Sequence, residues 1–144
     1  MKNITRSALV PFSAKQMFQL VNDIDNYHLF VPYCQQSSVI ERNQQQVTAK
    51  LQVAKSGIAK SFTTRNSLQE DTLIKMELVD GPFSHLSGNW SFTPLSDCAC
   101  KIELDLNFEF SNKLTTLAFS KIFNKLVQSM VAAFTQRAEK IYVK

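Results

Sequence analysis

Three residues of one loop, Asp80, Ser84 and His85, have the side-chain types of a hydrolytic triad. A triad needs these groups in one chain of hydrogen bonds, and residues so close together in a single loop cannot reach that arrangement easily. The sequence also lacks a G-x-S-x-G elbow, a P-loop and an H-E-x-x-H zinc motif. We therefore expect a polar turn at this position, and we predict that the chain is not an enzyme.

Two cysteines, Cys98 and Cys100, form a C-x-C pair on a segment of alternating polarity, where both would point to the same face. Zinc would need two further ligands, and the remaining candidates, His28, Cys34 and His85, follow no familiar ligand spacing. The spacing along a strand also disfavours a disulfide within the pair. We expect buried cysteines that act as small hydrophobic side chains, and no metal site.

Arg137 places a charge inside the apolar stripe of a C-terminal helix, four residues after Ala133 and four before Ile141. A charge in that position must be paired, must extend toward water, or must face a polar group of a ligand. Two interpretations stay open. One is a salt bridge to a strand carboxylate near the helix end, and the other is a hydrogen-bond donor to a ligand head group.

Basic side chains are concentrated in two parts of the chain. Residues 111–144 carry six lysines and arginines against Glu139 alone, and four more flank Gly57. This distribution favours RNA, a phospholipid surface or an acidic protein as a partner, although a solvated helix face would show the same pattern. Aromatic residues do not alternate with these cations, so we expect contacts to a nucleic-acid backbone rather than base stacking. The predicted anion-binding residues are Lys50, Lys55, Lys60, Arg65, Lys121, Lys125 and Lys140.

Length and composition indicate a single domain, residues 1–144, with a substantial core. The three glycines are too few for Gly-rich nucleotide-binding loops, and the 11 phenylalanines provide apolar surface for a core or a cavity. The N-terminus lacks the apolar core of a signal peptide, and no stretch is long enough to span a membrane. An odd number of cysteines fits a reducing compartment, so we predict a cytoplasmic protein.

A switch in hydrophobic period predicts how these residues are positioned. From Cys98 to Phe110 every even position is apolar and most odd positions are polar, which predicts a strand with one dry face. After a cap at Ser111 or Asn112, apolar residues recur every three or four positions as far as Ile141, which predicts a long helix. Upstream, the pattern predicts a strand over 3–10, short helices over 13–22 and 23–30, and strands over 34–42, 47–53, 58–68, 74–78 and 86–92, the last closed by Pro94.

Together these elements predict an α+β helix-grip fold: a curved antiparallel sheet wrapped around a long C-terminal helix, with two short helices after the first strand. Such a fold can enclose an apolar cavity. The loop over 80–83 would lie at the cavity mouth, where Phe83 would either plug the opening or pack in the core. The residues that we predict to line the cavity are Phe62, Phe83, Trp90, Phe92, Leu104, Phe108, Phe123, Met130 and Arg137.

The chain also carries a series of short segments in a specific order: ITRSALVP (4–11), QLVND (19–23), VP (31–32) with Cys34, FTTRN (62–66), LVDGPF (78–83), WSFTP (90–94), FEF (108–110), NKL (112–114), LAF (117–119) and FTQRA (134–138). In this order they resemble the START-like, coenzyme Q-binding family of helix-grip proteins, and especially its bacterial ribosome-association toxins. The resemblance extends over nearly the whole chain.

The resemblance implies a non-enzymatic binding protein with no required cofactor. Mitochondrial members of the family bind ubiquinone and support respiration, whereas the bacterial toxins bind the large ribosomal subunit and block its joining to the small subunit. The chain lacks the long N-terminal targeting extension of the mitochondrial members, which favours the bacterial function and a bacterial cytoplasmic location. The expected partners are the large ribosomal subunit through its rRNA backbone, an antitoxin protein, and an apolar molecule such as ubiquinone in the cavity.

Three hypotheses follow, in this order: a ribosome-directed binding protein, a carrier of a polyisoprenoid quinone or similar lipid, and an enzyme of the related cyclase type. The first two are compatible, because a cavity can be a property of the fold while the outer surface carries the function. The third would need an acid and a base inside the cavity. The apolar faces of the predicted strands and of the C-terminal helix offer almost no ionisable group except Arg137.

Overall fold

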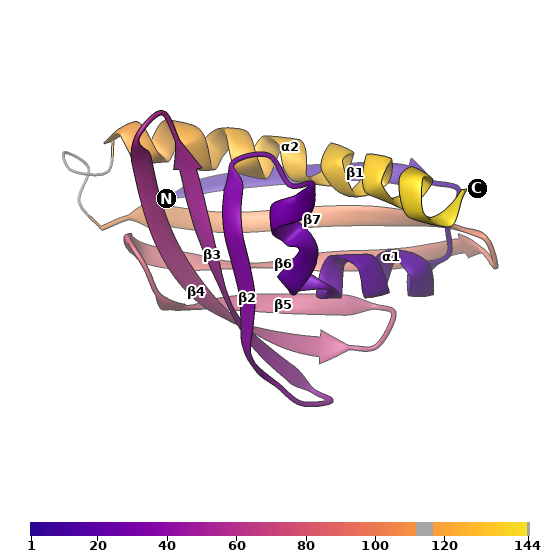
Figure 1. Ribbon diagram of the computed structural model, residues 1–144. Coiled ribbons are helices and arrows are strands. Elements are labelled where there is room, and N and C mark those ends of the chain that lie inside the picture. Colours follow the sequence, from indigo (N-terminus) through magenta and orange to yellow (C-terminus); the bar gives the residue numbers. More distant parts are fainter. Residues whose placement is uncertain (112–116, 144) are drawn as a thin grey trace.

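The computed structural model describes residues 1–111 and 117–143 and consists of a seven-stranded antiparallel sheet that curves around a long helix (Figure 1). The strands lie in the order β1-β7-β6-β5-β4-β3-β2, so β2 to β7 form a continuous meander and the first strand pairs with the last. The strands are β1 (Lys2–Val10), β2 (Cys34–Arg42), β3 (Gln46–Lys55), β4 (Ile58–Gln69), β5 (Leu73–Asp80), β6 (Phe83–Ser96) and β7 (Ala99–Phe110). The predicted helix-grip fold is confirmed.

Three helices accompany the sheet within the described residues: α1 (Ala14–Asn22), the 3-10 helix η1 (Ile24–Leu29) and α2 (Leu117–Tyr142). The predicted capping box of α1 is present, because the Gln16 N–H donates to Ser13 Oγ at 3.1 Å and the Ser13 N–H donates to Gln16 Oε1 at 2.9 Å. The predicted cap of α2, at Ser111 or Asn112, falls where residues 112–116 lie outside the described residues. No described helix is long and apolar enough to cross a membrane.

The core lies between α2 and the concave face of the sheet. Even-numbered residues of β7 from Cys100 to Phe108 are buried, as the alternation predicts. The ring of Phe123, on the inner side of α2, lies 4.9 Å from that of Phe83 and 5.0 Å from that of Phe108, measured between centroids. These edge contacts between aromatic rings fix the first half of α2 against the sheet.

Strand β6 does not end at Pro94, as predicted, but continues to Ser96. The Phe92 N–H donates to the Thr72 carbonyl, next to β5. The nitrogen of Pro94, two residues later, points toward the same edge of β6. The ladder with β5 ends at Ser91, and on that side Pro94 lies at a free edge where its missing N–H costs no hydrogen bond.

Two predictions at the ends of the apolar patterns are also wrong. Cys98 is exposed in the turn between β6 and β7, so the dry face of β7 begins at Cys100. Ile141 is 39% exposed, because the stripe of α2 ends before it. The last turn of α2 is instead attached to α1 through Tyr142, whose hydroxyl donates a hydrogen bond to the Gln16 carbonyl at 3.0 Å.

Candidate functional site

An apolar cavity of about 60 Å³ lies between α2 and the concave face of the sheet, with room for only a few water molecules. Its walls come from α1, η1, five strands and the middle of α2, so the whole fold is needed to form it. The lining residues are Val21, Ile24, Tyr27, Ala49, Leu51, Phe62, Thr64, Asn66, Ile74, Met76, Leu86, Trp90, Leu104, Leu106, Phe123, Leu126, Val127 and Met130.

The polar groups of the cavity are neutral. Asn66, on β4, is 5% exposed, and its Oδ1 accepts a hydrogen bond from Thr64 Oγ1 at 3.0 Å. The Tyr27 hydroxyl donates to the Val21 carbonyl. Burial, together with the nearby Cys34 and Asp23, raises the pKa of Tyr27 far above its ordinary value, so the phenol stays protonated. The cavity can therefore solvate a neutral acceptor group, but it contains no carboxylate, imidazole or ammonium for acid–base chemistry among its described lining.

Five of the nine predicted cavity residues line this space, namely Phe62, Trp90, Leu104, Phe123 and Met130. The other four do not. Phe83 and Phe108 belong to the aromatic cluster around Phe123, so Phe83 packs in the core. Phe92 contacts Phe18 of α1, with ring centroids 5.5 Å apart. Asn66 was not among the predicted cavity residues, because a polar residue on a strand is normally assigned to the solvent-exposed face.

Arg137 adopts neither of the two arrangements that its position in the helix suggests. Its guanidinium carbon lies 5.0 Å from the centroid of the Phe30 ring, a cation–π contact. No described carboxylate pairs with it, and it does not line the cavity. Its Nε is buried without a hydrogen-bond partner among the described residues. The guanidinium group of Arg137 thus lies over the ring of Phe30, outside the cavity.

The triad candidates do not assemble. Ser84 and His85 lie in β6 rather than in a turn, at an irregularity of the ladder where Phe83 pairs with Phe110 and His85 with Glu109. The Ser84 hydroxyl donates to the Glu109 carbonyl at 3.4 Å, whereas His85 Nε2 lies 2.9 Å from Ser87 Oγ. Cys98 and Cys100 also separate, one exposed and one buried, and no group of three or more metal-ligating side chains occurs among the described residues.

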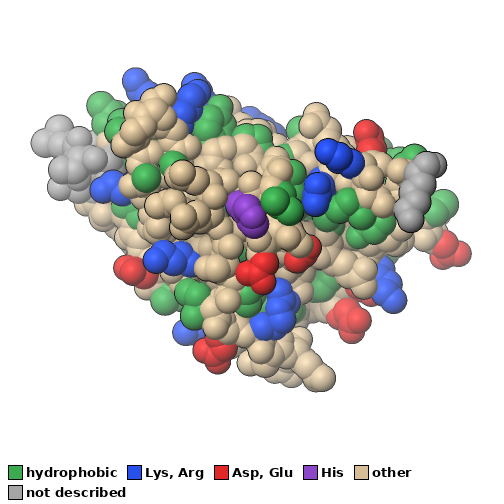
Figure 2. Space-filling model, in the orientation of Figure 1, with side chains coloured by type: hydrophobic (Ala, Val, Ile, Leu, Met, Phe, Trp, Pro, Cys, Tyr) green, Lys and Arg blue, Asp and Glu red, His purple; other side chains and the backbone are tan. Residues whose placement is uncertain are grey.

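The predicted anion-binding residues are divided between separate parts of the surface. Lys50 and Arg65 point to the outer face of β3 and β4, because the residues on either side of each face the interior. Lys121 and Lys125 are exposed on α2, and Lys140 is exposed near the other end of that helix. Figure 2 shows lysines and arginines dispersed over the visible face, with acidic side chains between several of them.

Lys55 and Lys60 flank the turn between β3 and β4 and are both exposed. The turn is tight because Ser56 and Gly57 both have positive φ angles, 52° and 82°. Lys55 Nζ lies 5.2 Å from the centroid of the Tyr33 ring, which belongs to the segment before β2. Strand pairing therefore brings an aromatic ring to the basic hairpin, a juxtaposition that the linear spacing of the residues did not show.

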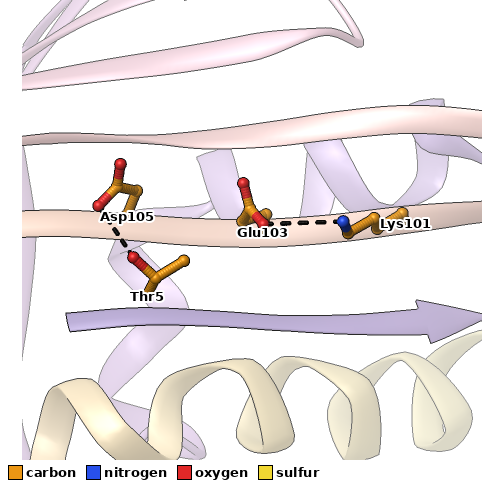
Figure 3. Close-up of polar contacts among 4 residues, drawn as sticks. All are labelled: Thr5, Lys101, Glu103 and Asp105. Carbon is orange, nitrogen blue, oxygen red and sulfur yellow. Dashed lines mark hydrogen bonds and ion pairs between the residues drawn. The ribbon is translucent and has the colours of Figure 1, made fainter.

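The outer face of β7 carries more acidic than basic side chains. Figure 3 shows three side chains in a row on β7: Lys101 Nζ lies 3.8 Å from Glu103 Oε2, and Asp105 accepts a hydrogen bond from Thr5 Oγ1 at 3.2 Å. Asn3 Nδ2 also donates to Asp105 Oδ1, at 2.7 Å. These carboxylates make the β1–β7 surface a poor site for a polyanion.

Residues 10–135 match the family described as polyketide cyclase / dehydrase and lipid transport. The chain belongs to this family. This member of the polyketide cyclase family is 54% identical over 142 residues to the ribosome association toxin RatA of Vibrio cholerae serotype O1, a match that covers 99% of each chain. It is 32% identical over 140 residues to the mitochondrial coenzyme Q-binding protein COQ10 of Drosophila melanogaster, covering 94% of this chain and 58% of that one.

Among solved structures, the Zhui aromatase/cyclase from Streptomyces sp. R1128 superposes with a TM-score of 0.84 at 16% identity, covering 96% of this chain and 94% of the other. At that identity the likeness shows the fold alone. The resemblance to the START-like, coenzyme Q-binding proteins that the sequence motifs suggest is thus confirmed at the level of the polyketide cyclase family.

Proposed function

We propose that this chain is a ribosome-directed binding protein that attaches to the large ribosomal subunit and blocks its joining to the small subunit, as the toxin of a toxin–antitoxin pair. The observation that carries the proposal is the 54% identity to a ribosome association toxin over 99% of both chains. The match therefore extends over the whole fold and is not limited to one element.

The surface chemistry supports a polyanionic partner. The chain has a net charge of +4, and the described ion pairs include none of the seven predicted anion-binding residues. Lysines without a carboxylate partner can contact phosphate without first breaking an existing ion pair. Because phosphate contacts release counterions, binding to a ribosomal subunit should weaken as the salt concentration rises.

Sedimentation with purified ribosomal subunits tests the proposal. The protein is mixed with large subunits, small subunits or both in a sucrose gradient, at low and at moderate salt. We expect comigration with the large subunit and fewer joined ribosomes, with both effects smaller at moderate salt. Protein that stays at the top of the gradient at both salts, with joined ribosomes unaffected, would exclude this function.

A second function, carriage of a quinone or similar apolar molecule, is favoured by the cavity and by the coenzyme Q-binding relative. The present volume of about 60 Å³ is smaller than a quinone head group, so binding would require α2 or the η1 segment to move outward. Asn66 then offers a hydrogen-bonding amide in an otherwise apolar site, a common arrangement in ligand pockets.

An Ala49→Leu variant separates the two functions, because Ala49 lines the cavity and is buried. A larger side chain there should abolish uptake of a short-chain ubiquinone, measured by quenching of Trp90 fluorescence, while sedimentation with large subunits is unchanged. The matched control is Ala59→Leu, at an exposed position of β4. Equal quinone uptake by all three proteins would contradict the carrier function.

A further inference from the structure

Among the described residues, Asn66 is the one side-chain amide that is buried, at 5% exposure. The register of the sheet places it on the concave face, where it lies opposite Val47 of β3 and Met76 of β5. Val47 is fully buried, and Met76 lines the cavity together with Asn66. An amide in such apolar surroundings costs free energy unless its donors and acceptors find partners. The hydrogen bonds of Asn66 therefore indicate what the cavity can hold.

The two ends of the Asn66 amide differ in their partners. The carbonyl oxygen, Oδ1, accepts a hydrogen bond from Thr64 Oγ1 at 3.0 Å. Thr64 is two residues away on β4 and so faces the same side of the sheet, and this bond fixes the orientation of the amide. Within residues 1–111 and 117–143, no group accepts a hydrogen bond from Asn66 Nδ2. Its two N–H donors are thus available to a molecule in the cavity.

The other polar side chains of the lining do not compensate for these free donors. The Tyr27 hydroxyl is engaged with the Val21 carbonyl, and the indole nitrogen of Trp90 is itself a donor. The complementary group on a ligand is therefore a hydrogen-bond acceptor. A carbonyl oxygen meets this requirement, because it accepts two hydrogen bonds and brings no proton that needs an acceptor of its own.

The charges around the cavity exclude an anionic ligand. The described lining contains no lysine, arginine or histidine, and the guanidinium group of Arg137 lies over the Phe30 ring outside it. Arg65, next to Asn66 on β4, points to the outer face of the sheet by alternation. A carboxylate or phosphate in the cavity would lose its hydration and gain no cation in exchange, which is far more costly than the transfer of a neutral carbonyl.

We propose that the cavity takes uncharged molecules with a carbonyl oxygen that accepts a hydrogen bond from Asn66 Nδ2, and that it rejects fatty acids and other anionic lipids. The inference rests on the second proposed function, the carriage of an apolar molecule, and names the chemical class of what is carried. It does not depend on binding to a ribosomal subunit.

The test uses three five-membered rings as probes: cyclopentanone, cyclopentane and, at pH 8, cyclopentanecarboxylate. Small rings keep the outward movement of α2 or η1 to a minimum. The proteins are the wild type, Asn66→Leu, which removes the donor at similar volume, and the control Asn89→Leu, the same change on the outer face of β6. Affinities are read from nuclear magnetic resonance spectra of the nitrogen-15-labelled proteins. The Asn66 side-chain signals are identified by their absence from Asn66→Leu.

Cyclopentanone should move the Asn66 Nδ2 proton signals downfield in the wild type, whereas cyclopentane should not. In Asn66→Leu the ratio of cyclopentanone affinity to cyclopentane affinity should fall about tenfold, because the carbonyl is then buried without a donor. In Asn89→Leu this ratio should change less than twofold. Cyclopentanecarboxylate should bind the wild type at least tenfold more weakly than cyclopentanone. Trp90 fluorescence shows whether each variant is folded, since this residue is 2% exposed.

Unmoved Nδ2 signals at saturating cyclopentanone, an unchanged affinity ratio in a folded Asn66→Leu protein, or equal binding of the carboxylate would overturn the inference. Failure of the wild type to bind either neutral ring would also overturn it. A short-chain ubiquinone separates this result from the carrier function. Equal ubiquinone uptake by the wild type and Asn66→Leu would remove the role of Asn66 and leave the carrier function intact. Cyclopentanone binding through Asn66 without ubiquinone uptake would exclude quinone carriage and support the selectivity for neutral carbonyl groups.

Discussion

Replacement of Phe134 by alanine should strongly lower the free energy of unfolding, because this residue connects three parts of the core. Phe134 is fully buried on α2, and its ring meets those of Tyr27, Phe30 and Trp90 edge-on at 5.1, 5.2 and 5.3 Å between centroids. Removal of a buried phenyl group typically costs about 3–5 kcal/mol. Because three aromatic rings surround this one, we expect a value in the upper part of that range, at about 4 kcal/mol. The melting temperature should fall by roughly 8–16 °C.

Urea denaturation followed by tryptophan fluorescence measures this effect, because Trp90 is the only tryptophan of the chain and lies against Phe134. A chain of this length has a total stability of roughly 7–20 kcal/mol, so the variant should still fold. The control, Leu29→Ala, removes a side chain that is 58% exposed and should change stability by less than about 0.5 kcal/mol. A decrease below about 1 kcal/mol for Phe134→Ala, with an unchanged m-value, would refute the role of this ring as the link between η1, α2 and the sheet.

Three further predictions address the turns, the cap and the thiols. Ser13→Ala removes the capping box of α1 and should cost about 1 kcal/mol in the same urea experiment. Gly88→Ala should destabilise the protein more than Gly57→Ala, because a Cβ at the first position would overlap a backbone carbonyl of β7, whereas the second has open space and only a strained φ of 82°. Burial raises the pKa of the Cys34 thiol to about 11, so at pH 8 it holds less thiolate than a free cysteine, and a thiol reagent should label the exposed Cys98 first. Equal labelling rates for the two thiols would contradict that order.

The fold could be predicted from the sequence because its signals are local. Alternation in β7, the apolar stripe of α2 and the capping residues at Ser13 each depend on neighbours within a few positions, and the structure shows all three. The errors occur where a pattern ends. Whether Pro94 closes a strand depends on which neighbour pairs with it, and that is decided by the length of β5.

The candidate sites were harder to predict because they depend on strand pairing. Aromatic content correctly indicated a cavity between helix and sheet, but not that Phe83 and Phe108 fill the space beside it. Asn66 was missed because its inward direction follows from register and not from polarity. Tyr33 and Lys55 are separated by 22 positions, yet β2–β3 pairing brings them together, so the linear sequence suggested no aromatic contact for the basic hairpin.

The pairing of β1 with β7 has a consequence for how the chain reaches its folded state. Lys2 lies opposite Phe108, so the strand of the sheet that is made before the other six pairs with the strand that is made after them. Translation at about 5–20 residues per second leaves β1 without its partner for roughly 5–20 s, while β2 to β7 form hairpins between sequence neighbours. Docking of β1 is therefore the late, non-local step of folding, and the nascent chain carries an open strand edge until β7 has been made.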